Sequence, residues 1–302
     1  MKDFLRIKDL YNNDIIELMK QTAENKASRG KNEEKILSGK TIGLIFAKPS
    51  TRTRVSFEVA INEMGGHCIF LNHKELQLGK SETLEDTATV LSRYIHGLII
   101  RTYAQSDVQR FAKNSSFPVI NALTNEYHPC QAFCDLFTIF ENTNGTFKNI
   151  RVAFLGDGAC NVANSLADAC RVAGMKLTIA SPEKFAPNPN LIKECIDEGV
   201  VNWVNDPIEA VKNADFIYTD TWVSMGFESD AQDRLQLIRP YQVNAKLMSH
   251  APSHAKVMHC LPANRNFELT DEVIDGPQSI VFDQAENRLH GQKTILKMLY
   301  GN

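Results

Sequence analysis

Short apolar runs alternate with helical patterns along the whole chain, and this alternation is the strongest constraint on its fold. Runs such as TIGLIFA at 41–47 suit buried strands, and the segments between runs carry apolar residues at helical spacing. Strict alternation of strands and helices predicts parallel sheets covered by helices on both faces. The expected strands lie at 41–47, 67–72, 96–103, 118–123, 150–155, 176–180, 201–204, 215–219, 256–259 and 279–282. The expected helices lie within the first 20 residues and at about 52–64, 82–94, 106–113, 128–141 and 284–300.

The alternating series runs twice, so we predict two α/β domains, each a doubly wound parallel sheet flanked by helices. The 302 residues suffice for two domains of about 150, and the hydrophobic content of 43% suffices for their cores. The stretch NTNGTFKN at 142–149 is polar and rich in turn residues, which predicts the boundary there. Ligands of open parallel sheets bind beyond the carboxyl ends of the strands, so functional residues are expected at strand ends.

Charge and cysteine content exclude several classes of protein. The 33 basic and 36 acidic side chains give a net charge of −3, whereas general nucleic-acid binding needs a basic face. No apolar run approaches the roughly 18 residues of a membrane span, and acids are scattered through the opening segment, unlike a signal peptide. The seven cysteines are dispersed without a C-x-x-C pair, which predicts reduced thiols in a cytoplasmic protein rather than disulfides or a zinc site.

The stretch KPSTRTRVSFEVA at 48–60 places positive charge and hydroxyl groups at a strand-to-helix turn. A helix start already carries unpaired N–H groups and partial positive charge, so arginines there oppose the helix dipole unless an anion binds. Ser50 and Thr51 are suitable N-cap residues. The alternative is a solvated basic turn whose arginines pair with nearby acids such as Glu58. The turn is therefore a candidate phosphate site.

Two further candidates follow strands in the first half. Arg101 ends the apolar run in LIIRTY, and either a core acid or a ligand can be its partner. His128 and Gln131 lie three residues apart in HPCQ, where Pro129 suits the first turn of a helix, so both side chains can project from one helix start. The alternative is a capping histidine and a surface glutamine. A histidine donor, a glutamine acceptor and nearby arginines can together contact the two sides of an amide-like carbonyl.

In the second half of the chain, the candidate residues also follow predicted strands. GDGACNVANSL at 156–166 has Asn161 at the third glycine position of a dinucleotide fingerprint, so its glycines are assigned to a tight turn and Asn161 to a polar contact. Asp220 follows a strand in TDTWVSMG and suits an ammonium group, although a surface loop with an N-cap aspartate is the alternative. In HCLP, Cys260 beside His259 is either a thiolate nucleophile or part of a shaped turn.

Four motifs in this order resemble one family over nearly the whole chain. They are STRTR at 50–54, HPCQ at 128–131, DTWVSMG at 220–226 and HCLP at 259–262. The chain resembles the ornithine carbamoyltransferases of the aspartate/ornithine carbamoyltransferase superfamily, and the SMG segment is what points to ornithine.

The resemblance implies an organisation and a reaction. It implies a carbamoyl phosphate-binding domain over 1–145, onto which the C-terminal helix at 284–302 packs back, and an ornithine-binding domain over 146–283. Two interdomain helices join them, and three copies form a homotrimer with active sites shared between subunits. The reaction carries the carbamoyl group of carbamoyl phosphate to the δ-amine of L-ornithine and gives L-citrulline and phosphate. It requires no metal and no organic cofactor.

The resemblance also implies a role for each motif residue. Phosphate binding falls to Ser50, Thr51, Arg52, Thr53 and Arg288, and Thr53 also reaches the carbonyl oxygen. Arg101 and His128 polarise that carbonyl, Gln131 accepts from the carbamoyl NH2, and Gln77 belongs to a loop that the neighbouring subunit contributes. The amino-acid end of ornithine falls to Asn161, Asp220, Ser224 and Met225. Cys260 and the Leu261 carbonyl lie near the reacting amine and complete the carbamoyl phosphate site.

The residue types suit this chemistry. Attack by a neutral amine builds negative charge on the carbonyl oxygen, which fixed donors stabilise, and no protein nucleophile is needed. Cys260 is therefore assigned to positioning and proton handling. Ala47 and Cys160 depart from the family pattern. The alternatives are a transcarbamoylase for another amine, such as putrescine or an acylated ornithine, and an idle binding protein with the same fold. Arginine biosynthesis is the expected context, with the catabolic direction as an alternative.

Overall fold

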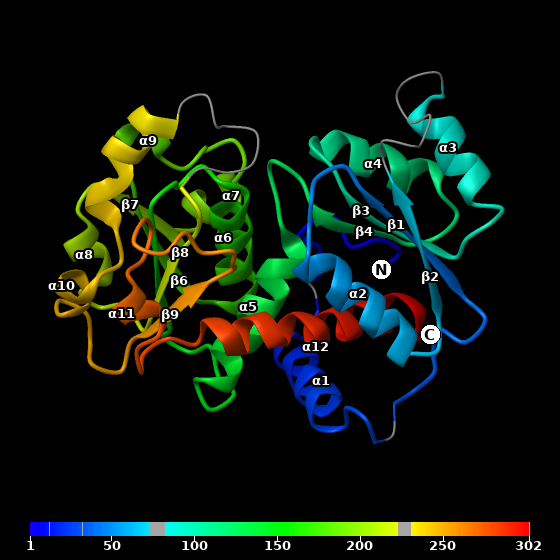
Figure 1. The fold of residues 1–302 in the computed structure, drawn as a ribbon, viewed down its shortest axis with the longest axis horizontal. Coiled ribbons are helices and arrows are strands. Elements are labelled where there is room, and N and C mark those ends of the chain that lie inside the picture. The colour runs from blue at the N-terminus through cyan, green and yellow to red at the C-terminus, as the bar shows by residue number, and fades with distance from the viewer. Residues whose placement is uncertain (12, 32, 73–81, 223–230, 302) are drawn as a thin grey trace. The chain divides into compact units, whose positions relative to one another are not determined.

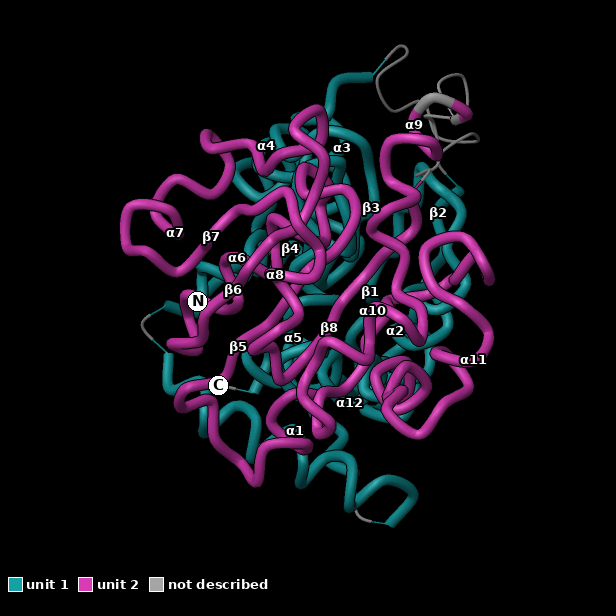
Figure 2. The backbone as a smooth tube through the Cα atoms, turned by 90° about the vertical axis from the view of Figure 1, so that its left-hand side faces the viewer, with its two compact units in different colours: residues 1–137, 287–302 teal, residues 138–286 magenta. Residues whose placement is uncertain are grey.

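The computed structural model describes residues 1–11, 13–31, 33–72, 82–222 and 231–301. Contacts divide the chain into two compact units (Figure 2). Unit 1 comprises Met1–Phe137 and Asn287–Asn302, and unit 2 comprises Thr138–Glu286. Two helices, α5 (Pro129–Glu141) and α12 (Val281–Tyr300), contribute residues to both units, so the division falls within helices rather than in the polar stretch 142–149.

Unit 1 is built on a four-stranded parallel sheet in the order β2-β1-β3-β4. Its strands are β1 (Thr41–Phe46), β2 (His67–Asn72), β3 (Gly97–Arg101) and β4 (Val119–Leu123). Its other elements are η1 (Ile7–Leu10), α1 (Ile15–Ala27), α2 (Arg52–Glu63), α3 (Leu84–Leu91) and α4 (Gln105–Asn114). Figure 1 shows α3 and α4 on one side of this sheet and α2 on the other. Strands β1, β3 and β4 are buried on both faces, as apolar runs in a covered parallel sheet should be.

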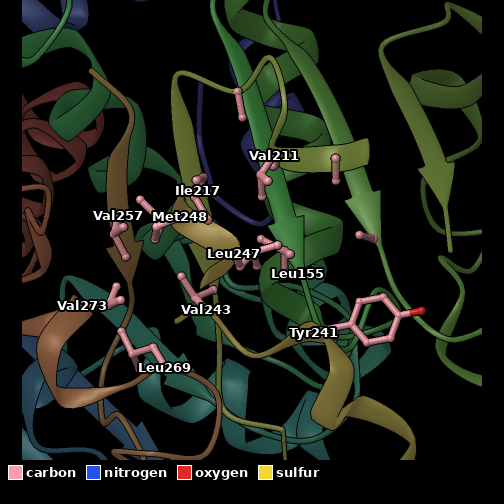
Figure 3. Close-up of a cluster of buried hydrophobic side chains, with 14 of the residues drawn as sticks. Leu155, Val211, Ile217, Tyr241, Val243, Leu247, Met248, Val257, Leu269 and Val273 are labelled. Carbon is pink, nitrogen blue, oxygen red and sulfur yellow. The ribbon is translucent and has the colours of Figure 1, made fainter. Parts of the chain in front are cut away.

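Unit 2 is built on a five-stranded parallel sheet in the order β7-β6-β5-β8-β9. Its strands are β5 (Arg151–Leu155), β6 (Lys176–Ala180), β7 (Val201–Val204), β8 (Phe216–Thr219) and β9 (Lys256–His259). The other elements are α6 (Asn161–Ala173), η2 (Glu183–Phe185), α7 (Lys193–Asp197), α8 (Pro207–Val211), α9 (Ala231–Ile238), η4 (Arg239–Tyr241), α10 (Ala245–Met248) and α11 (Asp271–Ile274). Leu155, Ile217 and Val257 project from its strands into a core with Val211 of α8 and Leu247 of α10 (Figure 3).

The predicted fold class is confirmed, because both sheets are parallel and flanked by helices. The strand expected at 279–282 is wrong: Ser279 makes an isolated bridge to Val257, and Val281 already begins α12. The apolar run there is the buried start of a helix, and short apolar runs do not distinguish that from a strand. Within the described residues, no helix has the length and apolar character that crossing a membrane requires.

The helix expected over the first 20 residues is also only partly right. Phe4 pairs with Ile120 of β4 in an isolated parallel bridge, and a short 3-10 turn follows. The first α-helix begins after Asp14, whose side chain accepts from the Glu17 N–H at 3.1 Å. An N-cap aspartate starts the helix there because it satisfies an N–H of the first turn.

Gly97 gives a stability prediction. A Cβ at this position would overlap Oη of Tyr300, which donates to the His96 carbonyl at 2.9 Å. We expect Gly97→Ala to lower the free energy of unfolding by about 1–3 kcal/mol, the usual cost of overpacking. Tyr300→Phe alone should cost about 1 kcal/mol for the lost hydrogen bond.

The double variant separates this cause from a general loss of strand stability. Because the closest contact is the hydroxyl oxygen, Gly97→Ala combined with Tyr300→Phe should be less destabilised than the sum of the single variants. Urea denaturation of the four proteins measures this coupling. Strictly additive losses would contradict the assigned clash.

Candidate active site

The candidate residues of unit 1 gather at the carboxyl ends of its strands. Arg101 ends β3, the turn with Ser50 and Thr51 follows β1, and His128 precedes α5 after β4. Carboxyl ends of parallel strands meet at one edge of the sheet, so these loops are neighbours. Arg101 and His128 are buried, at 7% and 5% exposure, which places both away from bulk water.

Arg288 links three of the predicted residues directly. Its Nη2 donates to Thr53 Oγ1 at 2.8 Å, and its Nη1 donates to Gln131 Oε1 at 2.5 Å. All three side chains are at most 3% exposed. The buried Nε of Arg288 has no hydrogen-bond partner among the described residues. Arg288 of α12 thus joins the first turns of α2 and α5 and retains a donor for a ligand.

The charges of this cluster affect the protonation of His128. Burial and then the charges of Arg288, Arg101 and Arg52 hold the pKa of its imidazole well below the usual value near 6.5. Its side chain is therefore neutral at pH 7. Three arginines that act on one buried histidine lie close enough to repel one another, so an anion between them would relieve the repulsion.

The two arginines of the STRTR turn differ. Arg54 Nε pairs with Glu58 Oε1 at 2.7 Å, as the solvated-turn alternative expects, and its guanidinium lies 3.7 Å from the Phe70 ring centroid. Arg52, in contrast, contributes to the field at His128. Thr51 occupies the N-cap position in a helical conformation without a side-chain cap bond. Thr51 is therefore the N-cap residue by position, as the sequence suggested, but its hydroxyl makes no cap hydrogen bond.

Lys48 is a fourth cation near this cluster. Its Nζ donates to Asn125 Oδ1 at 2.5 Å and lies 4.8 Å from the Tyr103 ring centroid. Burial, and then the charge of Arg101, lower the pKa of its ammonium group. The sequence placed Lys48 in the basic turn without a separate role, whereas the structure shows that it ties the β1–α2 turn to the loop before His128.

The buried side-chain amide of Gln105 stabilises the loop before His128 through hydrogen bonds. Gln105 Oε1 accepts from Asn121 Nδ2 at 2.9 Å and from Thr124 Oγ1 at 3.0 Å, and its Nε2 donates to the Leu5 carbonyl at 3.2 Å. Thr124 Oγ1 in turn accepts from the Tyr127 N–H at 3.0 Å. The sequence analysis missed Gln105, because a polar residue at a helix start carries no signal of its distant partners.

In unit 2, the structure brings Asp220 and Cys260 together. Asp220 follows β8 and Cys260 follows β9, and the Cys260 thiol donates to Asp220 Oδ1 at 3.0 Å. Asp220 Oδ1 also accepts from the Thr221 N–H at 2.7 Å. The carboxylate is therefore held in place at the end of its strand, with the thiol directed toward it.

The HCLP segment is a shaped turn, which favours one of the two alternatives for Cys260. His259 Nδ1 accepts from the Leu261 N–H at 2.8 Å, which leaves the ring proton on Nε2, and this faces Glu268 Oε1 at 3.2 Å. Leu261 has φ 56° and precedes a cis bond to Pro262. Since His259 makes these two contacts, it is not arranged as the base of a thiolate nucleophile.

Three possible metal ligands lie near one another in this turn. Asp220, His259 and Cys260 offer ligand atoms within 4.8 Å of one another. Both ring nitrogens of His259 are engaged, by Leu261 and by Glu268, so two donors remain. A catalytic zinc site uses three protein ligands, which this arrangement does not supply without breaking contacts of the turn.

Asn161 lies at the start of α6, in the loop that follows β5. Gly156 has φ 120°, a conformation that favours glycine, so the role in the turn is confirmed for this glycine. Cys160, one of the two departures from the family pattern, is the N-cap residue, and its sulfur accepts from the Ala163 N–H at 3.4 Å. Burial raises the pKa of this thiol well above its usual range.

An ion pair fixes the same loop to α9. Arg234 pairs with Asp157 through Nη2, and its Nε donates to the Trp222 carbonyl at 2.5 Å. The loop with Asn161 and the segment that leaves Asp220 are therefore held by one guanidinium. Gln77, Ser224 and Met225, which the sequence also nominated, lie outside the described residues.

Comparisons with known proteins agree with this geometry. Residues 2–141 match the family model of the carbamoyl-P binding domain of aspartate/ornithine carbamoyltransferase, and residues 148–299 match that of its Asp/Orn binding domain. The chain is 48% identical to an ornithine carbamoyltransferase of Bacillus thuringiensis over 99% of this chain and 94% of that protein. It is also 48% identical to one of Archaeoglobus fulgidus, over 100% and 98%.

Solved structures give the same result. The ornithine carbamoyltransferase of Pyrococcus furiosus superposes with a TM-score of 0.94 at 45% identity, covering 100% of this chain and 97% of that one. The anabolic enzyme of Campylobacter jejuni superposes with a TM-score of 0.91 at 35% identity, covering 99% of each chain. The chain belongs to the aspartate/ornithine carbamoyltransferase family.

Proposed function

We propose that the protein transfers the carbamoyl group of carbamoyl phosphate to the δ-amine of L-ornithine and releases L-citrulline and phosphate. The observation that carries this proposal is the arginine cluster of unit 1, in which the charges of Arg52, Arg101 and Arg288 act on the buried, neutral His128. The agreement of ornithine carbamoyltransferases with the chain over nearly its full length supports the choice of ornithine.

The phosphate falls to the β1–α2 turn and Arg288. Ser50 and Thr51 offer hydroxyls, the first turn of α2 offers backbone N–H groups, and Arg52 offers a guanidinium. Thr53 and Arg288 are already joined at 2.8 Å, so the phosphate meets a pre-organised donor set. The leaving phosphate gains charge as the reaction proceeds, and fixed cations stabilise that charge.

The carbamoyl group falls to Arg101, His128 and Gln131. A neutral imidazole has one N–H, which donates to the carbonyl oxygen together with the Arg101 guanidinium and the Thr53 hydroxyl. Gln131 offers its oxygen to the carbamoyl NH2. These donors are buried, which strengthens their effect on the negative charge that develops at the oxygen.

Ornithine falls to the strand ends of unit 2. Asp220 binds its ammonium group, and Asn161, Ser224 and Met225 contact the amino-acid end. Cys260 and the Leu261 carbonyl lie beside the reacting δ-amine. Because the Cys260 thiol donates to Asp220, it acts through a hydrogen bond and not as a nucleophile. No covalent enzyme intermediate is needed for this transfer.

The proposal includes a cytoplasmic homotrimer that works in arginine biosynthesis and in which Gln77 of one subunit completes the site of the next. Unit 1 offers a surface for such an assembly: Ile69 and Phe70 of the edge strand β2 and Val55 of α2 are exposed at 41%, 36% and 52%. Exposed apolar side chains grouped on an edge strand and its neighbouring helix suit a protein interface.

Substrate choice tests the proposed function directly. Citrulline formation from carbamoyl phosphate should proceed with ornithine at least about a hundredfold faster, in kcat/KM, than with putrescine or N-acetylornithine, because those amines lack one of the charged groups of ornithine. A carbamoyl transfer assay with the three amines measures this. No turnover with ornithine would sink the proposal, and preference for another amine would select the alternative substrate.

Arg52 and Arg54 form a matched pair for testing the phosphate site. Arg52→Gln should raise the KM for carbamoyl phosphate roughly 10- to 100-fold, the equivalent of a lost charged hydrogen bond, and leave the KM for ornithine within about threefold. Arg54→Gln removes only the partly exposed pair with Glu58, so both constants should stay within about threefold. Equal losses for both substrates in Arg52→Gln would contradict the assignment.

His128 predicts a pH dependence of stability. Its pKa in the folded protein is below the unfolded value near 6.5, so the unfolded chain binds a proton that the native imidazole does not. Its contribution to stability is complete above pH 6.5 and is lost as the pH falls toward the folded pKa. Urea denaturation without phosphate between pH 5 and 8 should therefore show a shallower pH slope for His128→Asn than for the wild type. Parallel slopes would refute this role of burial.

A further inference from the structure

A buried acid lies one helical turn beyond Gln131. Asp135 occupies α5, in the sequence PCQAFCDLFTIFE, and is 1% exposed. Its Oδ1 accepts from Gln131 Nε2 at 2.8 Å. Burial of a carboxylate is costly unless its oxygens are hydrogen-bonded, so an aspartate among apolar helix residues calls for a functional explanation. The roles assigned above to the site residues do not include it.

The two neighbours of the Gln131 amide make opposite demands. The Arg288 guanidinium offers only donors, and it contacts Oε1 at 2.5 Å. An ionised carboxylate offers only acceptors, and it contacts Nε2. A rotation of the amide by half a turn would set N–H against N–H on one side and oxygen against oxygen on the other. The amide is therefore held in one orientation from both ends.

Phosphate binding affects only one of the two contacts that orient the Gln131 amide. Arg288 is proposed above to bind the phosphate of carbamoyl phosphate, and that contact draws on the same guanidinium that holds Gln131 Oε1. Asp135 contacts the opposite end of the amide and takes no part in phosphate binding. With the ligand in place, the carboxylate is thus the contact that fixes the amide independently of the shared guanidinium.

We propose that Asp135 is a positioning residue that keeps the Gln131 oxygen directed at the carbamoyl NH2 and so makes the site select carbamoyl phosphate over acyl phosphates. This inference rests on the proposed function, since that assigns Gln131 to the carbamoyl group. A carbonyl oxygen accepts two hydrogen bonds, so Oε1 can accept from Arg288 and from the ligand NH2 together. A methyl group in place of NH2 leaves that buried acceptor unsatisfied, which a polar site rejects.

Acetyl phosphate is the probe, because it differs from carbamoyl phosphate only by CH3 for NH2. The measured quantity is the selectivity ratio, the Kd of acetyl phosphate over that of carbamoyl phosphate, obtained by calorimetry on the full chain without ornithine. Asp135→Leu keeps the shape of the side chain and removes the acceptor, so the ratio should fall roughly tenfold. Asp135→Asn can still present an oxygen to Nε2, so its selectivity ratio should lie within about threefold of the wild-type ratio.

Cys130→Ala is the matched control for packing. Cys130 is fully buried on the same helix and donates to the Asn121 carbonyl at 3.2 Å, without contact to the amide. The Cys130→Ala variant should have a lower melting temperature than the wild type and an unchanged selectivity ratio. If Asp135→Leu does not fold, Asp135→Ala takes its place, because alanine also lacks the acceptor: its ratio should fall roughly tenfold, whereas that of Cys130→Ala should stay unchanged.

The outcomes separate this inference from the proposed function. Binding of carbamoyl phosphate without turnover of ornithine would refute the proposed reaction and leave the selectivity test intact. Wild-type selectivity near 1 would refute the role of Gln131, and with it that of Asp135. An unchanged ratio in folded Asp135→Leu, with stability lowered as in Cys130→Ala, would show that the acid serves packing alone.

Discussion

The buried guanidinium of Arg288 is the interaction on which the candidate site of unit 1 depends. It comes from the end of the chain and donates both to Thr53 of α2 and to Gln131 of α5. A buried charge is tolerated only when hydrogen bonds compensate its desolvation, so each of these contacts also secures the helix that supplies it. Chain segments that are more than 150 residues apart thereby become one rigid donor set.

The arginine cluster lowers the stability of the ligand-free protein and strengthens the binding of an anion. Arg52, Arg101 and Arg288 repel one another and also disfavour a proton on His128, so the ligand-free cluster holds unfavourable electrostatic energy. A dianionic phosphate relieves it on binding, whereas a neutral molecule does not. The proposed preference for a phosphorylated ligand and the neutral state of His128 therefore have one physical cause, which is the charge gathered at the carboxyl edge of the sheet.

The sequence predicts the parts of the site that depend on local pattern. Strand ends supplied Arg101, His128, Asp220 and Cys260, because apolar runs followed by unusual polar residues are visible without a structure. The resemblance assigns Arg52, and not Arg54, to the phosphate, and the ion pair of Arg54 with Glu58 agrees with that separation. Gln105 was missed because its contact with the Leu5 carbonyl joins residues 100 positions apart. Asp135 was missed because an acid in an apolar helix gives no sign of its contact with Gln131. The run at 279–282 was wrong because strand and helix starts share an apolar pattern.

The pairing of Phe4 with Ile120 limits how unit 1 can associate. Phe4 N donates to the Val119 carbonyl and Asn121 N donates to the Phe4 carbonyl, each at 2.9 Å, so the backbone of β4 on its outer side is occupied by a segment of the same chain. Among the described residues, no strand pairs with the outer side of β2, so the sheet has one capped edge and one open edge in that part of the chain. A linear polymer of sheets needs two open edges on every copy. Within the described residues, unit 1 offers one, so strand addition from copy to copy ends after a single step.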